Sequence, residues 1–429
     1  MIAMIRNVSY RRVALLPPVR GLLVFIALLS AACAPEVGDE GEPGSPWVGT
    51  TRTEGRVTTV VNESGSIWGG RATLVETASI GAADGPAEFL LGRVRGVYVA
   101  DAKVFVFDPS VSAVRVYDLQ GRHLFDFGRS GLGPGEFRQP TAITQGPAGR
   151  ILVRDGVAAR VSLFDVDGNY EDTWPLTRGL AVARRMLVTS EGHVYTPGIV
   201  SGSTRETRLL GMLRIGPSGP TGEHRSAPED GVDPPKVSDA GYYVPFWPKG
   251  SWSMAPSGAM VASIGDEYRF EIRHPDGSVT VVRRSIDSVP VQAAEAQWHR
   301  RVALASLREL SPGVVWSGPA IPSTKPFIRE IHVGLDGRIW VRREGLGVQA
   351  SSCNERPTPG SVRDAPCWTS PVIVDLFDGN GRFLADLELP SEFSLNTASV
   401  FIRGDLVVFP LEDAAGTIRV KLYELKRPG

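Results

Sequence analysis

Residues 128–168 read GRSGLGPGEFRQPTAITQGPAGRILVRDGVAARVSLFDVDG, and this stretch decides the fold. Its pentapeptide GPGEF, at residues 133–137, nearly repeats the GPAEF of residues 85–89, which begins 48 residues earlier. β-Branched and aromatic residues follow most of the glycine turns, a composition that favours strands in a packed sheet. A repeat of this length is typical of a propeller or a solenoid.

Two series of short strands continue the pattern along the chain. Strands of the first series follow a glycine or small-residue turn, and strands of the second end at a turn glycine, which supplies the positive φ of a tight hairpin. The first series comprises residues 100–107, 147–154, 190–197, 256–263 and 335–342, and the second comprises residues 116–122, 163–169, 272–278 and 376–382. The interval between the turn glycines is 19 residues from Gly149 to Gly168 and again 19 from Gly258 to Gly277. This equal spacing predicts one repeated four-stranded unit.

The units resemble the NHL-type propeller repeat, in which a glycine-rich connection leads to an inner strand that begins with Pro. Residues 128–168 match that order, including Pro140, Asp155 and Phe164. The match is specific over residues 80–170 and weaker beyond them. The resemblance implies a propeller whose blades are four-stranded antiparallel sheets.

Counting the units predicts an all-β fold, a six-bladed β-propeller of four-stranded antiparallel blades with a short helical insertion. The expected blades are residues 92–127, 138–174, 180–219, 251–284, 327–387 and 394–425. Residues 56–62 and 67–75 precede the first blade, and we expect them to close the ring by pairing with the last blade, because open sheet edges promote aggregation. Two separate all-β domains are the alternative, but no polar linker interrupts the series.

The N-terminus has the three parts of an export signal. Residues 1–20 carry four Arg and no acidic residue, and residues 21–29 form an apolar run too short to span a bilayer. The segment LSAAC at residues 29–33 resembles the lipobox of bacterial lipoproteins, although Ser30 stands where that motif has Leu. The resemblance implies lipid attachment at Cys33, and ordinary signal cleavage nearby is the alternative.

Processing at Cys33 would divide the chain into three parts: a lipoprotein-type signal peptide at residues 1–32, a flexible tether at residues 33–55, and the propeller at residues 56–429. The tether is rich in Pro, Gly, Asp and Glu. Loss of the first 32 residues would leave 397 and would change the formal charge from −1 to −5. We therefore expect a lipid-anchored, monomeric protein of the cell envelope that faces the periplasm or the exterior.

The chain contains three cysteines. If Cys33 carries a lipid, Cys353 and Cys367 remain as a pair, and an even pair in an exported chain indicates a disulfide. Closing that loop should stabilise the fold by about 3 kcal/mol. Zinc binding is less favoured, because neither residue has a CxxC neighbour.

Three long insertions are expected on one face of the predicted propeller. Residues 220–250 and 285–326 lie between blades, and residues 344–371 lie between the second and third strands of a blade. Loops at the rim of a rigid scaffold commonly hold binding residues. The second insertion contains a predicted helix over residues 293–310, which Ser311 and Pro312 stop.

The candidate ligand-binding residues lie on this face. Tyr242, Tyr243 and Trp247 of the first insertion could stack on a sugar ring or anchor a peptide, although packing on the propeller is the alternative role for these rings. Asp108, Asp155 and Arg343 end second strands that run toward the same face. An Asp at such a position commonly caps the following turn, and we favour capping over ligand contact.

Local signatures of catalysis are absent from the sequence. It has no GxSxG elbow, P-loop, GxGxxG, HExxH or CxxC motif, and its six His do not recur at equivalent positions of the units. We therefore expect no catalytic residue, no metal and no cofactor. Lys plus Arg number 46 against 47 Asp plus Glu, which leaves no positive excess for nucleic acid.

Two functions remain. The favoured one is a binding or scaffold module of the cell envelope that uses the inserted face to hold a protein, peptide or glycan. The alternative is a propeller hydrolase or lyase, of the lactonase or amidating-lyase sort, with a central metal or acidic site. Fold analogy alone supports this alternative.

Overall fold

Strands make up nearly all of the regular structure in the computed structural model, which describes residues 45–176, 185–201, 209–226, 234–239, 241–351, 367–389, 400–413 and 415–429. Cys33, Cys353 and the predicted signal peptide lie outside these residues. Across the described ranges no helix has the length and apolar character needed to cross a membrane. The strands form a six-bladed β-propeller with four-stranded antiparallel blades, as the repeat predicts.

The blades follow one another along the chain, each listed here from the inner strand outward. Blade 1 comprises β4 (Gly96–Ala100), β5 (Lys103–Asp108), β6 (Ala113–Asp118) and β7 (His123–Phe127), and blade 2 comprises β10 (Pro140–Gln145), β11 (Ile151–Asp155), β12 (Arg160–Phe164) and β13 (Tyr170–Pro175). Blade 3 comprises β14 (Leu187–Val188), β15 (Val194–Ser201), β16 (Leu209–Gly216) and β17 (Gly219–Ser226), and blade 4 comprises β20 (Ser251–Met254), β21 (Met260–Ser263), β22 (Arg269–Arg273) and β23 (Val279–Arg284). Blade 5 comprises β24 (Glu330–Val333), β25 (Ile339–Glu344), β28 (Val372–Phe377) and β29 (Phe383–Leu389), and blade 6 comprises β30 (Phe401–Arg403), β31 (Leu406–Glu412), β32 (Ile418–Lys426) and β3 (Thr73–Ile80).

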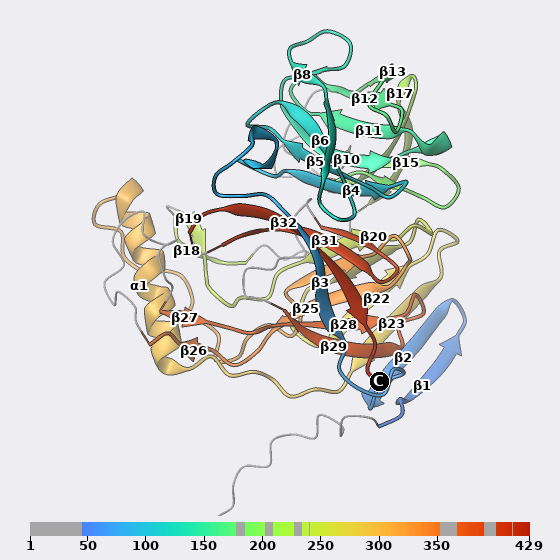
Figure 1. The fold of residues 1–429 in the computed structure, drawn as a ribbon. Coiled ribbons are helices and arrows are strands. Elements are labelled where there is room, and N and C mark those ends of the chain that lie inside the picture. The colour runs from blue at the N-terminus through green and yellow to red at the C-terminus, as the bar shows by residue number, and fades with distance from the viewer. Residues whose placement is uncertain are drawn as a thin grey trace, which may run out of the picture. The chain divides into compact units, whose positions relative to one another are not determined.

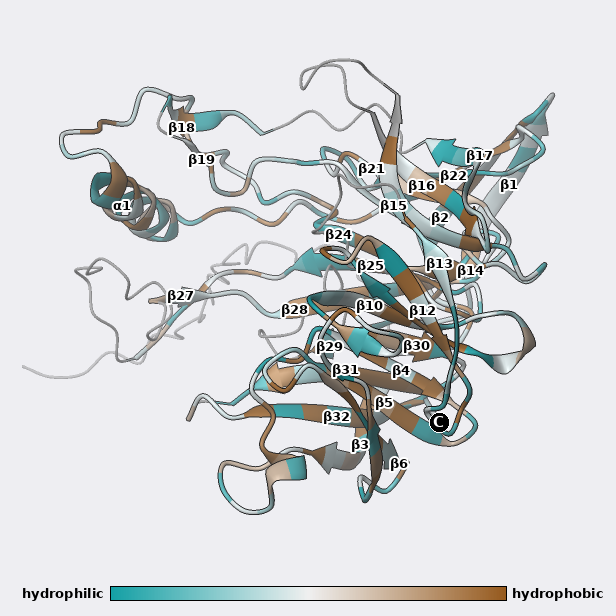
Figure 2. Ribbon diagram, turned by 90° about the horizontal axis from the view of Figure 1, so that it is seen from above, coloured by the Kyte–Doolittle hydropathy of each residue, from teal (hydrophilic) through white to brown (hydrophobic). Residues whose placement is uncertain are grey.

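The core lies between the faces of neighbouring blades, where apolar residues gather on the strands (Figure 2). Phe137, the last residue of the GPGEF motif, is fully buried, and its ring centroid lies 5.8 Å from that of Phe164 and 6.3 Å from that of Phe107. Gly128 has a φ of +80°, and a Cβ on it would lie 2.1 Å from the Phe137 ring. The repeated motif therefore serves packing: a glycine makes room for an aromatic ring between blades 1 and 2.

Short elements complete the connections in this regular part of the ring. A 3₁₀ turn, η1 (Ala87–Phe89), precedes blade 1, and a parallel pair, β8 (Arg129–Ser130) with β9 (Glu136–Phe137), precedes blade 2. A second 3₁₀ turn, η2 (Pro147–Gly149), joins β10 to β11.

The ring closes through β3, which pairs antiparallel with β32 from Thr73 opposite Lys426 to Ile80 opposite Val420. Figure 1 shows β3 in the same sheet as β32 and β31, although β3 comes from near the opposite end of the chain. The prediction of closure on the last blade is thus correct for residues 73–75 of the predicted segment. Pairing the first and last parts of the chain protects both sheet edges.

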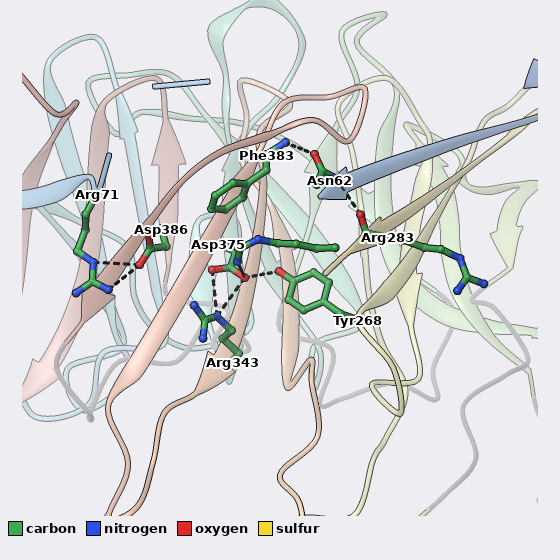
Figure 3. Close-up of polar contacts among 9 residues, drawn as sticks. Asn62, Arg71, Tyr268, Arg283, Arg343, Asp375, Phe383 and Asp386 are labelled. Carbon is green, nitrogen blue, oxygen red and sulfur yellow. Dashed lines mark hydrogen bonds and ion pairs between the residues drawn. The ribbon is translucent and has the colours of Figure 1, made fainter. Parts of the chain in front are cut away.

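The pairing predicted for residues 56–62 is wrong. They lie in β2 (Val57–Ser64), which pairs in parallel with β23 of blade 4, while β1 (Val48–Glu54) pairs with β2 at the outer edge of that blade. Asn62 explains the placement: its side-chain amide donates to the carbonyls of Arg283 (3.1 Å) and Gly381 (3.0 Å), and its Oδ1 accepts from the amide of Phe383 (2.8 Å) (Figure 3). These bonds hold β2 at the junction of blades 4 and 5.

Two further boundaries differ from the prediction. The tether was expected to extend to residue 55, but β1 is ordered into a strand by its pairing with β2. Blade 3 was expected to end at residue 219, but β17 begins there and supplies its fourth strand. The first insertion therefore starts after Ser226 rather than at residue 220. The sequence did not reveal β17 because this strand is polar and lacks the apolar pattern expected of a strand.

Candidate functional site

Three insertions rise from the part of the ring formed by blades 3 to 5 and pack against one another. The first carries β18 (Lys236–Ser238) and β19 (Gly241–Tyr243), the second carries α1 (Ala293–Leu310), and the third carries β26 (Val348–Gln349) and β27 (Trp368–Thr369). Figure 1 shows α1, β18, β19, β26 and β27 on the same side of the view. We call the described residues of 234–250, 285–326 and 344–371 the inserted layer. Its packing agrees with the expectation that the insertions share one face.

Helix α1 has the predicted bounds and forms the centre of the inserted layer. Its first turn is closed by a capping box, in which the backbone N–H of Gln292 donates to Glu295 (3.2 Å). On one side Ala303 and Leu307 pack with residues of the first insertion, and on the other Trp298 and Val302 pack with the third. The helix is therefore a packed structural element.

Lys325 joins all three insertions at one buried point. Its ammonium group pairs with Glu295 at 2.9 Å, and both side chains are only 1% exposed. It also donates to the carbonyl of Gly345 (3.0 Å) and to the Ser370 hydroxyl (2.6 Å), and it lies 5.3 Å from the ring of Phe246. A buried pair whose other polar positions are hydrogen-bonded fixes geometry, because breaking it leaves an uncompensated charge. The inserted layer is thus held in one arrangement.

The predicted aromatic candidates divide into two kinds. Tyr242 and Tyr243 are 41% and 51% exposed on β19. Trp247 instead packs in the apolar cluster formed with α1, and the neighbouring Phe246 is buried against His299, whose pKa burial lowers to about 4. Trp247 therefore has the packing role that the sequence analysis gave as the alternative. Tyr242 and Tyr243 stay candidates for contact with a ligand at the surface.

Asp108 and Asp155 cap turns, as favoured from the sequence. Both are fully buried. Asp108 accepts from the backbone N–H groups of Gly92, Arg93 and Ser110 and from the Ser110 hydroxyl, at 2.5 to 3.2 Å. Asp155 accepts from four backbone N–H groups, those of Arg138, Gln139, Val157 and Ala158, at 2.6 to 3.1 Å. Both carboxylates therefore satisfy backbone groups of the turns that they cap.

Arg343 also proves to be buried, and its partner is Asp375. The Arg343 Nε lies 3.2 Å from both carboxylate oxygens of Asp375, which is 0% exposed and also accepts from Arg284 (2.6 Å) and from the Tyr268 hydroxyl (2.5 Å) (Figure 3). Burial raises the pKa of Asp375, but Arg284 and then Arg343 outweigh burial and hold that pKa below its usual value. Tyr268 and Arg284 belong to blade 4, so this network joins blades 4 and 5. Arg343 thus belongs to a buried network between two blades, and its role in ligand binding stays a prediction.

A cavity of about 480 Å³ lies where the inner strands of all six blades meet. Its lining includes Val97 of β4, Ile143 of β10, Leu187 of β14, Trp252 of β20 and Val333 of β24. Phe401 represents β30 in the same lining. This volume is typical of small-molecule sites, which are concave and mostly apolar with a few placed polar groups.

Three basic residues line the cavity at the starts of inner strands. Arg185 precedes β14, Lys249 precedes β20 and Arg329 precedes β24. In an antiparallel blade the inner strand starts on the face where the connection from the preceding blade arrives. The first two insertions are such connections, so Lys249 and Arg329 mark the end of the cavity that faces the inserted layer.

Among the described residues, positive charge exceeds negative charge around this end of the cavity. Arg329 pairs with Glu344 (3.1 Å), and Arg342 lies 3.5 Å from Glu330 and 3.9 Å from Glu344. With Arg185 and Lys249, four cations face these two carboxylates, because His332 is neutral: burial, then Arg185, lowers its pKa to about 3. The described groups at this end thus carry an excess of two positive charges, in a chain whose net charge is −1.

The sequence did not single out these cavity residues. A signal was present, because in three consecutive units a basic residue stands one or two positions before the inner strand. Degenerate repeats hid it, since the inner strands of blades 3 to 5 could not be aligned by motif. The described residues contain no group of three or more His, Cys, Asp or Glu side chains placed to hold a metal ion.

Comparisons with known proteins concern the fold. A family described as a 6-bladed beta-propeller, DUF5128, matches residues 85–177. A solved structure of a DUF4221 member from Bacteroides vulgatus is 9% identical, with a TM-score of 0.48 over 83% of this chain and 99% of that chain. Catalytically inactive virginiamycin B lyase from Staphylococcus aureus is 12% identical (TM-score 0.36; 82% and 99%), and the calcium-binding protein regucalcin from Agrobacterium tumefaciens is 12% identical (0.35; 82% and 98%). No curated protein matches the chain.

Proposed function

We propose that this protein is an exported, lipid-anchored propeller with NHL-like repeats that acts as a binding module of the cell envelope. Tyr242 and Tyr243, exposed on the inserted layer, would contact its protein, peptide or glycan partner. The observation that carries the proposal is that a cross-braced layer, fixed by the buried Glu295–Lys325 pair, presents two exposed aromatic rings. Rings held in place before binding lose little conformational freedom when a partner arrives.

Backbone geometry supports this role. Tyr242 has a φ of +60° and Phe246 a φ of +59°. Bulky side chains rarely adopt this left-handed region, which costs about 1–2 kcal/mol per residue. Such conformations persist where the surrounding structure fixes them, and they cluster at ligand-binding sites.

The leader supports the location in the envelope. An export signal that ends at Cys33 would leave the propeller tethered outside the cytoplasm, where a disulfide between Cys353 and Cys367 could form. Cys367 is buried beside Trp298 and Val302, so a bond at this position would fix the third insertion against α1.

The enzymatic alternative gains no specific support from the cavity. Its mechanism needs carboxylates or several His at the channel, whereas the described lining carries three basic residues, one His and no carboxylate. We therefore propose binding rather than catalysis.

Partner binding is tested with Tyr242→Asn and Tyr243→Asn in the tagged full-length protein. Asn tolerates a positive φ, so Tyr242→Asn should leave the thermal midpoint unchanged. A partner recovered from envelope extract with the wild type and identified by mass spectrometry should bind the double variant at least tenfold more weakly. Tyr170→Asn is the matched control, because Tyr170 is a similarly exposed tyrosine on β13 of blade 2. Equal binding by the wild type and the double variant would refute the proposal.

The anchor and the disulfide have separate tests. Cells fed a radioactive fatty acid should label the wild type and not Cys33→Ala, and equal labelling of the two would exclude an anchor at this residue. Intact mass before and after reduction should differ by two hydrogen atoms if Cys353 and Cys367 are bonded.

A further inference from the structure

The cavity is graded from basic to apolar along the strands that line it. Along β20 the lining passes from Lys249 through Ser251, Trp252 and Ser253 to Met254. The neighbouring β24 shows the same gradient, from Arg329 through His332 to Val333 and Leu335. Inner strands run in one direction, so the basic ends lie together next to the inserted layer and the apolar ends lie together deeper in the ring.

Lys249 is the least compensated of the basic groups. In the described part of the chain its ammonium group forms no hydrogen bond and no ion pair with a protein group, and it is half-buried. Burial lowers the pKa of Lys249, and Arg329 and Arg342 lower it further, while Glu330 and Glu344 oppose them. A cation held among other cations and partly removed from water gains most from an anion placed beside it.

Hydrogen-bond donors continue from this basic end into the cavity. The Ser251 Oγ accepts the backbone N–H of Ile331 (2.8 Å), and the Ser253 Oγ accepts that of Val333 (3.1 Å). Each hydroxyl therefore retains its own proton for donation. The Nδ1 of His332 is buried without a partner among the described residues. Since a neutral imidazole has one donor and one acceptor nitrogen, this atom can still form a hydrogen bond with a ligand.

Beyond these donors the wall of the cavity is apolar. Trp252, Met212 and Met254 form one apolar cluster between blades 3 and 4, and Phe401 packs edge-on against Tyr98 on the opposite side. Thioether and aromatic surfaces adapt to flat or irregular apolar groups.

We propose that the central cavity binds a small organic anion that carries one acidic group on an apolar body, with the acidic group beside Lys249 and Arg329 and the body against Trp252 and Met254. This site is separate from the tyrosine surface of the inserted layer, and the inference does not depend on the proposed partner binding there. The enclosed volume suits a small molecule and not a polymer.

Two dyes that share one ring system and differ by a sulfonate group test the proposal. The anionic probe is 8-anilinonaphthalene-1-sulfonate, and the neutral probe is N-phenyl-1-naphthylamine, which has the same ring system without the sulfonate. Fluorescence titration of the full-length protein should give a dissociation constant at least tenfold lower for the anionic dye, because a charge-assisted contact in a partly buried site strengthens binding by about that factor or more.

The variant Lys249→Met then tests whether the anionic dye binds in the cavity or on another surface. Because the Lys249 ammonium has no partner among the described residues, this variant should keep the thermal midpoint of the wild type. Its affinity for the anionic dye should fall about tenfold, and its affinity for the neutral dye should stay the same. Lys426→Met is the matched control, since Lys426 lies on β32 in an exposed pair with Glu424. The proposal would be overturned if the wild type bound the two dyes with equal affinity, or if Lys249→Met bound the anionic dye as tightly as the wild type does.

Discussion

Blades 3 to 5 and blades 6, 1 and 2 line one cavity with opposite chemistry. Among the lining residues that the structure describes, the basic residues Arg185, Lys249 and Arg329 all belong to the first group, whereas the second group contributes apolar and neutral residues such as Val97, Ile143 and Phe401 and no charged one. The insertions also rise from the first group. We infer that the half of the ring that departs from the repeat carries the recognition chemistry, and that the half containing the regular blades 1 and 2 carries the fold.

Buried carboxylates show the same contrast. In blades 1 and 2, Asp108 and Asp155 accept almost entirely from backbone N–H groups within their own repeat. In blade 5, Asp375 instead accepts from three side chains, two of them from blade 4. Local motifs encode the first arrangement, while the second depends on two blades meeting.

The largest expected effect is that of Asp375→Asn. This change removes the carboxylate charge that Asp375 places beside the buried Arg284 and Arg343, so the free energy of unfolding should fall by about 3–5 kcal/mol. Chemical denaturation of the wild type and the variant measures the difference.

Asp386→Asn is the matched control for Asp375→Asn. Asp386 pairs with Arg71 at 3.0 Å, but the pair is solvent-exposed, and its loss should cost less than about 1 kcal/mol (Figure 3). Similar losses for the two variants would remove the distinction between a buried junction and a surface pair.

Asp155→Ala should have a smaller effect in the regular half. Four backbone N–H groups would lose their acceptor, and the free energy of unfolding should fall by about 2–3 kcal/mol. The loss stays below that of Asp375→Asn because water can reach the two turns and replace part of the lost hydrogen bonding. Hydrogen exchange should show the loss of protection confined to blade 2. Loss of protection across the whole ring would contradict a local role for this residue.

The smallest expected effect concerns pH. His332 has a pKa lowered to about 3, mainly by burial and then by Arg185, from an ordinary value of 6.5. It should stay neutral from pH 5 to 7, so the affinity for the anionic dye should change less than twofold over this range. A marked gain in affinity on acidification, with a midpoint near 6.5, would instead mean that His332 becomes protonated in the cavity.

The regular half of the fold could be predicted because its determinants are local. Gly128, Gly168 and Phe137 specify the turns of one repeat and its packing on the repeat before it. Residues 293–310 carry their own helix composition and stop signal. Residues 56–62 were assigned to the wrong blade, because Asn62 contacts groups more than 200 residues away. No local pattern encodes such a contact.

The candidate site was predictable only in part. Tyr242 and Tyr243 stood out as aromatics in a loop rich in Pro and Gly, but the packing of Trp247 on α1 arises from two separate insertions. Arg343 could not be matched to Asp375 from the sequence, since the third insertion separates β25 from β28, and the two strands become neighbours only in the folded blade. Lys249 is an ordinary lysine in the sequence, and its significance comes from the half-buried place that it occupies without a partner among the described residues.

Anomalous diffraction from crystals soaked with 4-bromobenzoate would locate an organic anion in the cavity, because the bromine marks the apolar end of a small organic acid. We expect one bromine peak inside the cavity near Trp252 and Met254, with the carboxylate within hydrogen-bond distance of the Lys249 ammonium. Bromobenzoate bound with its carboxylate toward blades 1 and 6, or no bromine peak in the cavity, would contradict the assignment of recognition to the irregular half of the ring.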